Sequence, residues 1–345
     1  MSQPLLSVRD LAVSFSTEAG EARAVDGLSL ELAAGEVLAL VGESGCGKSV
    51  TALALMGLLA KGSASVEGSA RYGETELIGA SEARLRAIRG AEIAMVFQDP
   101  LSSLNPVQRV AGQVAEQILA HADVAPASAR ERAVALLRRV GVSEERAGSY
   151  PHELSGGMRQ RVMIAMALSC APSVLIADEP TTALDVTVQA QILDLIGELR
   201  DETGAGVILV THDLGVVAEL ADRVAVMYAG RIVEQGTVED VFRDPQHPYA
   251  WGLLGAVPRL DRPRGEPLPA VDGVPPSPTA KPAGCHFRPR CPHEHAACAE
   301  APALEHRGGG RDQADRCWLG AEEKRELRAL GGRIGLWPAR EAAAR

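Results

Sequence analysis

The spacing of apolar and polar positions divides the chain into four regions. Between residues 5 and about 40, short apolar patches alternate with polar positions, as in antiparallel strands. Residues 80–165 are rich in predicted helix, because apolar positions recur there at helical spacing. Residues 170–235 alternate apolar runs with helical segments, which is typical of a parallel sheet. Prolines crowd together between 258 and 282 and indicate a linker, and a small module rich in cysteine and histidine follows it.

A glycine-rich segment lies between a predicted buried strand, residues 36–41, and a predicted buried helix, residues 50–59. Its sequence, GESGCGKS at residues 42–49, fits the pattern G-x-x-x-x-G-K-[ST] that surrounds the phosphates of nucleoside triphosphates. A strand, a glycine-rich turn and a helix N-terminus form an anion site, because backbone N–H groups point into the loop and the helix dipole favours phosphate. The segment therefore predicts a P-loop that binds a nucleoside triphosphate with Mg²⁺.

Each residue type in the P-loop has an expected role. The glycines let the backbone curl around the β-phosphate without Cβ clashes. Lys48 should reach the β- and γ-phosphates, and the Ser49 hydroxyl should bind the Mg²⁺. The nucleotide-binding residues predicted in this segment are Gly42, Ser44, Gly45, Cys46, Gly47, Lys48, Ser49 and Val50.

Five more motifs follow the P-loop along the chain. They are VFQDP at 96–100, LSGGMRQR at 154–161, VLIADEP at 174–180, TALD at 182–185 and VTHD at 210–213. In this order they resemble the Q-loop, signature motif, Walker B strand, D-loop and switch histidine of ABC ATPases, which hydrolyse ATP. The resemblance implies an α/β fold, namely an ABC-type P-loop NTPase. It would have an antiparallel β subdomain, a helical subdomain over about residues 85–165 and a small Cys-rich C-terminal module.

Four polar residues in these motifs suit ATP hydrolysis, which needs charge neutralisation and an aligned water. Asp178 ends an apolar strand, so its carboxylate should emerge beside the P-loop and bind the Mg²⁺ shell. Glu179 follows it and should orient or deprotonate the attacking water. His212 also ends a strand and should hydrogen-bond the γ-phosphate, and Gln98 should contact Mg²⁺ or the water. In isolation these would be ordinary solvated strand ends, but within the ordered set they are the predicted catalytic and magnesium-binding residues.

A second anion-binding turn is predicted at the start of a helix, where Ser155, Gly156 and Gly157 belong to the signature motif. One nucleotide does not need two such sites in one chain. In ABC ATPases the signature of one subunit closes over the ATP of the other. The resemblance therefore implies a head-to-tail dimer with two ATP molecules at its interface, beside Asp185. ATP would close this dimer, and hydrolysis would open it.

The adenine base should stack on an aromatic ring near the N-terminal strands. Phe15 is the one aromatic residue that precedes the P-loop, and it is the predicted adenine contact. The alternative is that Phe15 belongs to the hydrophobic core.

Composition narrows the class of protein. A length of 345 residues indicates two domains, and 46% hydrophobic residues suffice for a sizeable core. A net charge of −10 argues against a general nucleic-acid binder. The N-terminus has no apolar signal core, and no apolar run reaches the ~18 residues that span a bilayer. We therefore expect a cytosolic chain, or a peripheral one held on the cytoplasmic face of the cell membrane by its partners.

Four longer stretches narrow the family. They are residues 96–106, 150–161, 182–193 and 247–254. Together they resemble the ATPase subunits of the dipeptide, oligopeptide and nickel branch of ABC importers, and Met158 in the signature is similar to the D-type subunit. The resemblance covers about residues 5–318 and implies ATP-driven import of di- or oligopeptides. The implied partners are two permeases, an extracytoplasmic solute-binding protein and a second ATPase, usually an F-type chain. Nickel or another solute is the alternative cargo.

These observations give a domain prediction. The ATP-binding domain would cover residues 1–257, the proline-rich linker 258–283, the cysteine-rich module of oligopeptide transporters 284–318, and a tail 319–345. The resemblance also implies that the permeases dock on the segment after Gln98.

The six cysteines fall into two groups. Cys46 in the P-loop and Cys170 after the signature helix are predicted to be small packing residues. The others form a set with the spacing C-x5-C-x6-C-x18-C, namely Cys285, Cys291, Cys298 and Cys317. A cytosolic setting disfavours disulfides, and four thiolates can hold zinc or an iron–sulfur cluster.

The resemblance favours a 4Fe-4S cluster, because peptide-importer ATPases carry a similar cysteine pattern that ligates one in some members. Tight C-x2-C knuckles, which most zinc ribbons have, are absent. Zinc, with His286, His293 or His295 as further ligands, stays open as an alternative, and so does the absence of any metal.

Other classes of ABC protein fit less well. A translation factor would carry two ATPase cores in one chain, and this sequence has one. A repair or chromosome ATPase would place a long coiled coil between P-loop and signature, and here that interval is short. An exporter usually has fused membrane spans, which the sequence lacks.

Overall fold

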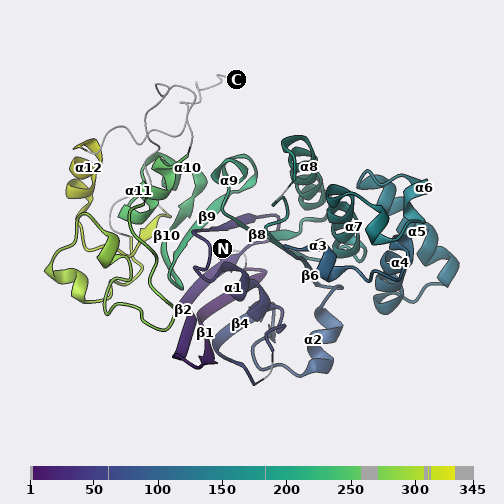
Figure 1. Cartoon of the computed structure of the whole chain (residues 1–345), viewed down its shortest axis with the longest axis horizontal. Helices are drawn as coiled ribbons and strands as arrows, with labels where there is room; N and C mark the ends of the chain where they lie inside the picture. The colour runs from purple at the N-terminus through teal and green to yellow at the C-terminus, as the bar shows by residue number, and fades with distance from the viewer. Residues whose placement is uncertain are drawn as a thin grey trace.

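The computed structural model describes residues 3–60, 62–182, 184–257, 271–306, 310 and 312–330. Within these residues a seven-stranded sheet runs through the centre in the order β11-β10-β9-β3-β8-β7-β6 (Figure 1). Its strands are β3 (Val37–Val41), β6 (Ile93–Val96), β7 (Val174–Asp178), β8 (Gly206–Thr211), β9 (Arg223–Tyr228), β10 (Arg231–Thr237) and β11 (Ala314–Asp315). Strands β9, β3, β8, β7 and β6 run parallel, whereas β10 and β11 are antiparallel to their neighbours.

The central parallel strands are apolar because both faces of the sheet are covered. Every residue of β3, β7 and β8 is buried. Their register pairs Val41 with Thr211, and Asp178 with Val210, so the three strands end at one edge of the sheet. The segments that follow them therefore meet at that edge, where open α/β sheets bind their ligands.

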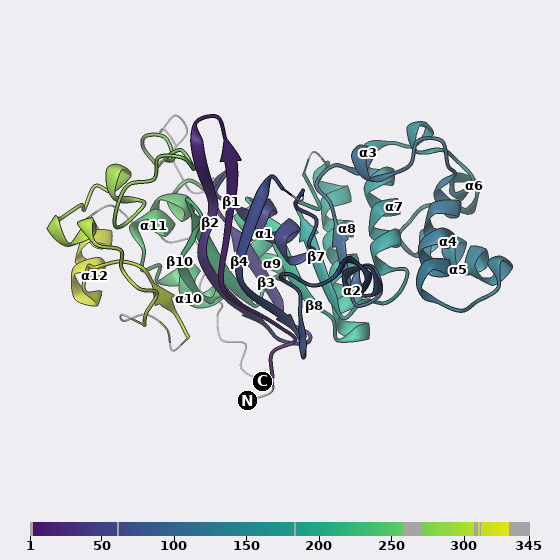
Figure 2. The same ribbon diagram turned by 90° about the horizontal axis from the view of Figure 1, so that it is seen from below.

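A smaller antiparallel sheet, in the order β2-β1-β4-β5, confirms the predicted β subdomain. Its strands are β1 (Leu6–Thr17), β2 (Gly20–Leu32), β4 (Ala64–Tyr72) and β5 (Thr75–Glu76). Buried residues such as Leu11 and Leu28 share one core with Leu38 of β3 and Leu55 of α1. Figure 2 shows β1, β2 and β4 beside α1, between the helical part of the chain and the C-terminal part.

The helices divide between a lateral subdomain and the faces of the main sheet. The bounds are α1 (Lys48–Leu55), α2 (Glu82–Ile88), α3 (Pro100–Ser103), α4 (Val110–His121), α5 (Pro126–Arg139), α6 (Glu144–Ala147), α7 (Gly156–Leu168), α8 (Val186–Thr203), α9 (Leu214–Leu220), α10 (Val238–Arg243), α11 (Pro248–Gly255) and α12 (Ala321–Leu330). Helices α3 to α7 lie together on one side of the molecule (Figures 1 and 2). Val114, Ile118 and Leu137 form part of their core, in agreement with the predicted helical subdomain.

In the residues that the structure describes, the C-terminal region packs against the ATP-binding domain and extends its main sheet. Strand β11 pairs with β10 and so extends the main sheet by one strand. Phe287 packs against Tyr228 and Tyr249, with ring centroids 5.2 and 5.5 Å apart. Of the predicted linker, residues 258–270 lie outside the described part of the chain. The rest returns to the β subdomain, where Arg23 N donates to the Pro278 carbonyl oxygen at 3.1 Å.

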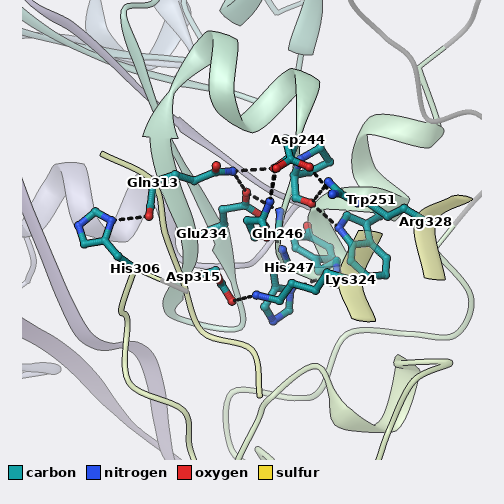
Figure 3. Close-up of polar contacts among 12 residues, drawn as sticks. Glu234, Asp244, Gln246, His247, Trp251, His306, Gln313, Asp315, Lys324 and Arg328 are labelled. Atoms are coloured by element: carbon teal, nitrogen blue, oxygen red, sulfur yellow. Dashed lines mark hydrogen bonds and ion pairs between the residues drawn. The ribbon is translucent and has the colours of Figure 1, made fainter. Parts of the chain in front are cut away.

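Helix α12 lies within the predicted tail and is anchored by a buried ion pair; residues 331–345 of that tail are not described. Lys324 Nζ donates to Asp315 Oδ1 at 2.7 Å, and the two side chains are 0% and 1% exposed (Figure 3). Arg328 also pairs with Asp244 and donates to the Pro245 carbonyl oxygen. The helix is therefore part of the folded structure.

A buried carboxylate joins β10 to the same region. Glu234 of β10 is 0% exposed and accepts hydrogen bonds from the backbone N–H groups of Gln246 and His247, at 2.8 and 2.7 Å, and from Gln313 Nε2 at 2.7 Å (Figure 3). Burial raises the pKa of Glu234 from 4.5 to about 7, against the effect of these hydrogen bonds.

Glu234 should make folding stability depend on pH. Since its pKa in the folded state is raised, the folded chain binds the proton more tightly than the unfolded chain. The contribution is complete below about pH 4.5 and is lost as the pH rises through about 7. Between pH ~5 and ~7 we expect a loss of about 2 kcal/mol. Urea unfolding of the native chain and of Glu234→Gln across this range measures it; parallel pH profiles for the two chains would contradict it.

Candidate active site

The P-loop joins the end of β3 to α1, which begins at Lys48. Gly47 has φ +112°, and a Cβ there would lie 2.6 Å from the Ala24 carbonyl oxygen, so only glycine fits. Lys48 Nζ is buried and folds back on the loop, where it donates to the carbonyl oxygens of Gly42 at 2.8 Å and Glu43 at 3.0 Å. The ammonium therefore lies over the loop, where its N–H groups can donate hydrogen bonds to phosphate oxygens.

Ser49 and Asp178 form the oxygen pair that suits Mg²⁺. Ser49 is the second residue of α1, and its Oγ donates to Asp178 Oδ1 at 3.0 Å. Asp178 ends β7 and is 4% exposed. Burial raises the pKa of Asp178, although the hydrogen bond from Ser49 opposes this. A hydroxyl and a carboxylate at this spacing are hard ligands, and a bound cation would stabilise the buried carboxylate.

Glu179 is the centre of a polar cluster that brings together three sequence-predicted residues. Its Oε2 accepts hydrogen bonds from Gln98 Nε2 at 3.0 Å and from Thr182 Oγ1 at 2.9 Å. His212 Nδ1 lies 3.2 Å from Oε1. The Glu179 backbone has φ +47°, and the Glu179 N–H donates to the Val210 carbonyl oxygen at 2.8 Å. A left-handed non-glycine residue costs on the order of 1 kcal/mol, and such residues concentrate at functional sites.

The electrostatics favour an ionised Glu179. Burial alone would raise its pKa, but the hydrogen bonds from Thr182 and His212 outweigh burial and lower it. The carboxylate side chain is 14% exposed, whereas that of His212 is 60% exposed. The lowered pKa and the fixed orientation of Glu179 suit the predicted role of a base, and the exposed His212 ring can reach a group that approaches from solvent.

The signature turn and the D-loop lie together at the starts of two helices. Ser155 caps α7, and its Oγ accepts from Met158 N at 3.3 Å. Asp185 caps α8, and its Oδ1 accepts from Val188 N at 2.9 Å. A Cβ on Gly157 would lie 3.1 Å from Val188, so the two helix starts are in contact. Gly156 opens α7 with open space around its Cβ position, which leaves this end of the helix accessible.

Phe15 is half-buried on β1, between Ala22 of β2 and Ala64 of β4. It packs against the core shared with α1 and also lines a groove of about 490 Å³ with residues of the β1–β2 turn. Both readings of this residue, core phenylalanine and adenine contact, are compatible with that position. Its role with adenine stays a prediction.

The four C-terminal cysteines line one cavity, but the structure does not arrange them as metal ligands. Cys285, Cys291, Cys298 and Cys317 are free thiols that line one cavity of about 10 Å³, together with His293 and His295. Burial raises the pKa of Cys291 to about 11 and of Cys317 to about 12. Among the described residues no group of three or more Cys, His, Asp or Glu side chains is arranged to hold a metal ion. The predicted cluster or zinc centre is therefore not supported, and His286 instead faces the Ala229 carbonyl oxygen at 3.0 Å.

The structure adds residues to the site that sequence reasoning missed. The sequence places Thr182 in the D-loop motif, and its position three residues after Glu179 allows the hydrogen bond described above. Glu43 stands at an x position of the P-loop pattern, to which the pattern assigns no role. It forms a two-point ion pair with Arg290, at 2.8 and 3.1 Å, which no local pattern could indicate.

Lys48→Ala should weaken ATP binding about ten- to a hundredfold. Hydrogen bonds between charged groups contribute about 1.5–3 kcal/mol each, and the alanine chain would lose those to phosphate. Titration calorimetry of the full chain with ATP and Mg²⁺ measures the effect. Lys48→Arg, which keeps the charge, should lose less, and unchanged affinity in Lys48→Ala would contradict the phosphate role.

The geometry and two family models define the class of protein. A P-loop, a strand-end Asp–Glu pair, and a Gln and a His that converge on the glutamate form the site of a P-loop ATPase. The model for ABC transporters matches residues 25–182. The model for the C-terminal region of oligopeptide/dipeptide transporters matches residues 233–298, so it begins within β10, well before residue 284.

Full-length relatives narrow the family. The chain is 49% identical over 334 residues to the dipeptide transport ATP-binding protein DppD of Bacillus subtilis, covering 96% of this chain and 98% of the relative. It is 52% identical over 321 residues to the oligopeptide transport ATP-binding protein OppD of Escherichia coli, covering 92% and 94%. The chain belongs to the peptide-transporter family of ABC ATP-binding proteins.

A solved structure agrees with the fold. It is a dimer of the ATP-binding cassette MJ0796 in a post-hydrolysis state, bound to ADP and Pi. The TM-score is 0.63 at 26% identity, and the match covers 68% of this chain and 98% of that chain. In the part of this chain that is described, no helix is both long and apolar enough to cross a membrane.

Proposed function

We propose that this chain is the ATP-hydrolysing subunit of a membrane importer of di- or oligopeptides. The observation that carries the proposal is that this chain is 49% and 52% identical in sequence to two peptide transport ATP-binding proteins, over 96% and 92% of its length. The matching C-terminal region supports the same branch of ABC proteins. Both named relatives are peptide transport proteins, so nickel is not favoured as the cargo.

The site supports a simple division of tasks. Lys48 would bind the phosphates, and Ser49 with Asp178 would hold Mg²⁺, which when bound would neutralise phosphate charge. Glu179 accepts the proton of the attacking water, since its carboxylate is oriented by Thr182, His212 and Gln98. His212 then donates to the γ-phosphate from its exposed position. Gln98 donates a hydrogen bond to Glu179, so the Gln98 side chain should move when the carboxylate turns towards the water.

A second subunit completes this site. Ser155, Gly156 and Gly157 offer backbone N–H groups at the free end of α7, which is an anion-binding end of a helix. In a head-to-tail dimer this end would cover the ATP of the partner, with Asp185 at the interface. The dimer of MJ0796 with ADP and Pi supports such an assembly. Closure with ATP and opening after hydrolysis would then drive transport. An F-type chain is the proposed second ATPase.

A groove beside Gln98 suits the permeases. It measures about 270 Å³ and lies between the segment that follows α1, strand β6, and helices α4 and α7. Its lining includes the flexible side chains Met56, Met95, Met163 and Met166, which adapt well to a docked helix. Phe97, which precedes Gln98, also lines the groove. A helix docked there would contact the segment after β6 that positions Gln98. We assign this groove to the cytoplasmic helices of two permeases, which would hold the chain at the inner face of the membrane and receive solute from an extracytoplasmic binding protein.

The four C-terminal cysteines are also the proposed ligands of a 4Fe-4S cluster. Four cysteines from one cavity are a suitable donor set, but the cavity holds about one water, so the thiols would have to move apart around a cluster. When bound, the cluster would serve to crosslink the C-terminal region. Iron and sulfide analysis of the full chain purified without oxygen tests this; a colourless, iron-free chain would refute it.

Peptide-stimulated ATP hydrolysis tests the proposed function. The chain is assembled with its permeases, binding protein and second ATPase in lipid vesicles, and short peptides or nickel are added in turn. We expect stimulation by peptides and uptake of peptide into the vesicle, with neither in the Glu179→Gln complex. Stimulation by nickel alone, or by neither, would overturn the peptide assignment while leaving the ATPase site in place.

A further inference from the structure

The second residue of the P-loop is held by the C-terminal region. Both carboxylate oxygens of Glu43 accept from Arg290, at 2.8 Å from Nη1 and 3.1 Å from Nη2. The Glu43 backbone N–H donates to the Tyr249 hydroxyl at 2.9 Å. Tyr249 and Arg290, both more than two hundred positions further along the chain, thus hold the backbone and the side chain of this one P-loop residue.

Arg290 is itself rigidly placed. Its side chain is 5% exposed, and its Nε and Nη2 donate to the carbonyl oxygens of Asp272 and Val271, at 2.7 and 2.9 Å. The guanidinium carbon lies 5.6 Å from the ring centroid of Tyr228 and 6.0 Å from that of Phe287. A planar guanidinium with these partners is pre-organised, so it holds the carboxylate in one orientation.

The same P-loop residue contacts the phosphate-binding lysine. The Glu43 carbonyl oxygen accepts from Lys48 Nζ at 3.0 Å. Glu43 therefore connects Arg290 to the ammonium that should bind ATP. Its carboxylate is also a negative charge within a loop that must accept phosphates. Paired with Arg290 this charge is neutralised, whereas unpaired it would repel the nucleotide.

We infer that Arg290 is a positioning residue for ATP binding: it neutralises Glu43 and holds the P-loop in the shape that receives the phosphates. The inference rests on the proposed ATP site. It assigns the C-terminal region a direct part in nucleotide affinity, beyond the motifs between the P-loop and His212.

The test is a double-mutant cycle on the full chain, with ATP and Mg²⁺ titrated by calorimetry. Arg290→Ala should weaken ATP binding about tenfold, because it leaves Glu43 charged and unpaired. Glu43→Gln should change affinity less than about threefold, and the double variant should recover to about that level. This recovery is the readout that a merely structural role for Arg290 would not give.

Arg288→Ala is the matched control. Arg288 lies in the same short helix, Arg288–Arg290, but pairs with Glu294 at 2.8 Å inside its own segment. It should bind ATP like the native chain. If Arg290→Ala does not fold, Arg290→Lys replaces it, since it keeps one charge beside Glu43 and should give an intermediate loss that Glu43→Gln again reduces.

The outcomes separate the two claims. Native-like affinity in Arg290→Ala, or a double variant as weak as Arg290→Ala, would overturn the inference while Lys48→Ala still weakens binding. Unchanged affinity in Lys48→Ala would instead remove the proposed ATP site itself.

Discussion

Glu179→Gln should hydrolyse ATP at least about a hundredfold more slowly than the native chain, while binding ATP with similar affinity. A positioned general base contributes about 10²–10⁴-fold to rate, and an amide cannot take up the proton of the water. The amide oxygen can still accept from Thr182, which keeps the local structure intact. Phosphate release by the assembled complex, together with ATP binding, separates the chemical step from affinity.

The same variant should trap the closed dimer. If hydrolysis opens the dimer, a chain that cannot hydrolyse should stay associated with its ATPase partner when ATP is present, as measured by light scattering during gel filtration. Glu92→Gln is the control, because that carboxylate accepts from Tyr72 in the β subdomain, at 2.8 Å. Normal turnover in Glu179→Gln would overturn the assignment of Glu179 as the base.

Lys324→Ala should lower the free energy of unfolding by about 3–5 kcal/mol. Removing one member of a buried ion pair leaves the other charge buried without compensation. Both Lys324 and Asp315 are essentially inaccessible to solvent, so water cannot replace the ammonium. Urea unfolding of the full chain at fixed pH measures the change.

Two comparisons make this prediction specific. Lys324→Met combined with Asp315→Asn removes both charges and should recover most of the lost stability. Arg71→Ala breaks the exposed pair with Glu74 and should cost less than about 1 kcal/mol. Equal losses in Lys324→Ala and Arg71→Ala would contradict the view that burial gives the ion pair its importance.

The parts of the site that the sequence predicted are those with a local signal. The P-loop, Asp178–Glu179 and His212 each lie at the end of a short apolar strand, and parallel strands place such ends at one edge of a sheet. Their proximity in the structure follows from that rule. The helix after the P-loop is shorter than predicted and ends at Leu55, because Gly57 adopts φ +60° and ends the helical hydrogen bonding.

The parts that the sequence did not predict depend on long-range pairing. The Glu43–Arg290 and Asp315–Lys324 contacts join residues whose spacing has no helical or strand period. Strand β11 has two residues, too few for any alternation. Composition made the cysteine-rich segment look like a separate module, whereas edge pairing with β10 incorporates it into the ATPase sheet. The cysteine spacing predicted convergence, but it carries no information on what the thiols hold.

The return of the C-terminal region to the sheet has a consequence for how the protein is made. A nascent chain that has left the ribosome as far as α11 already contains every motif for hydrolysis, from the P-loop to His212. It still lacks Arg290, and the edge of β10 that β11 covers is bare and open to pairing with other chains. A prematurely terminated chain would thus expose an unpaired strand edge and would be prone to aggregation. Its P-loop would also lack the contact between Glu43 and Arg290.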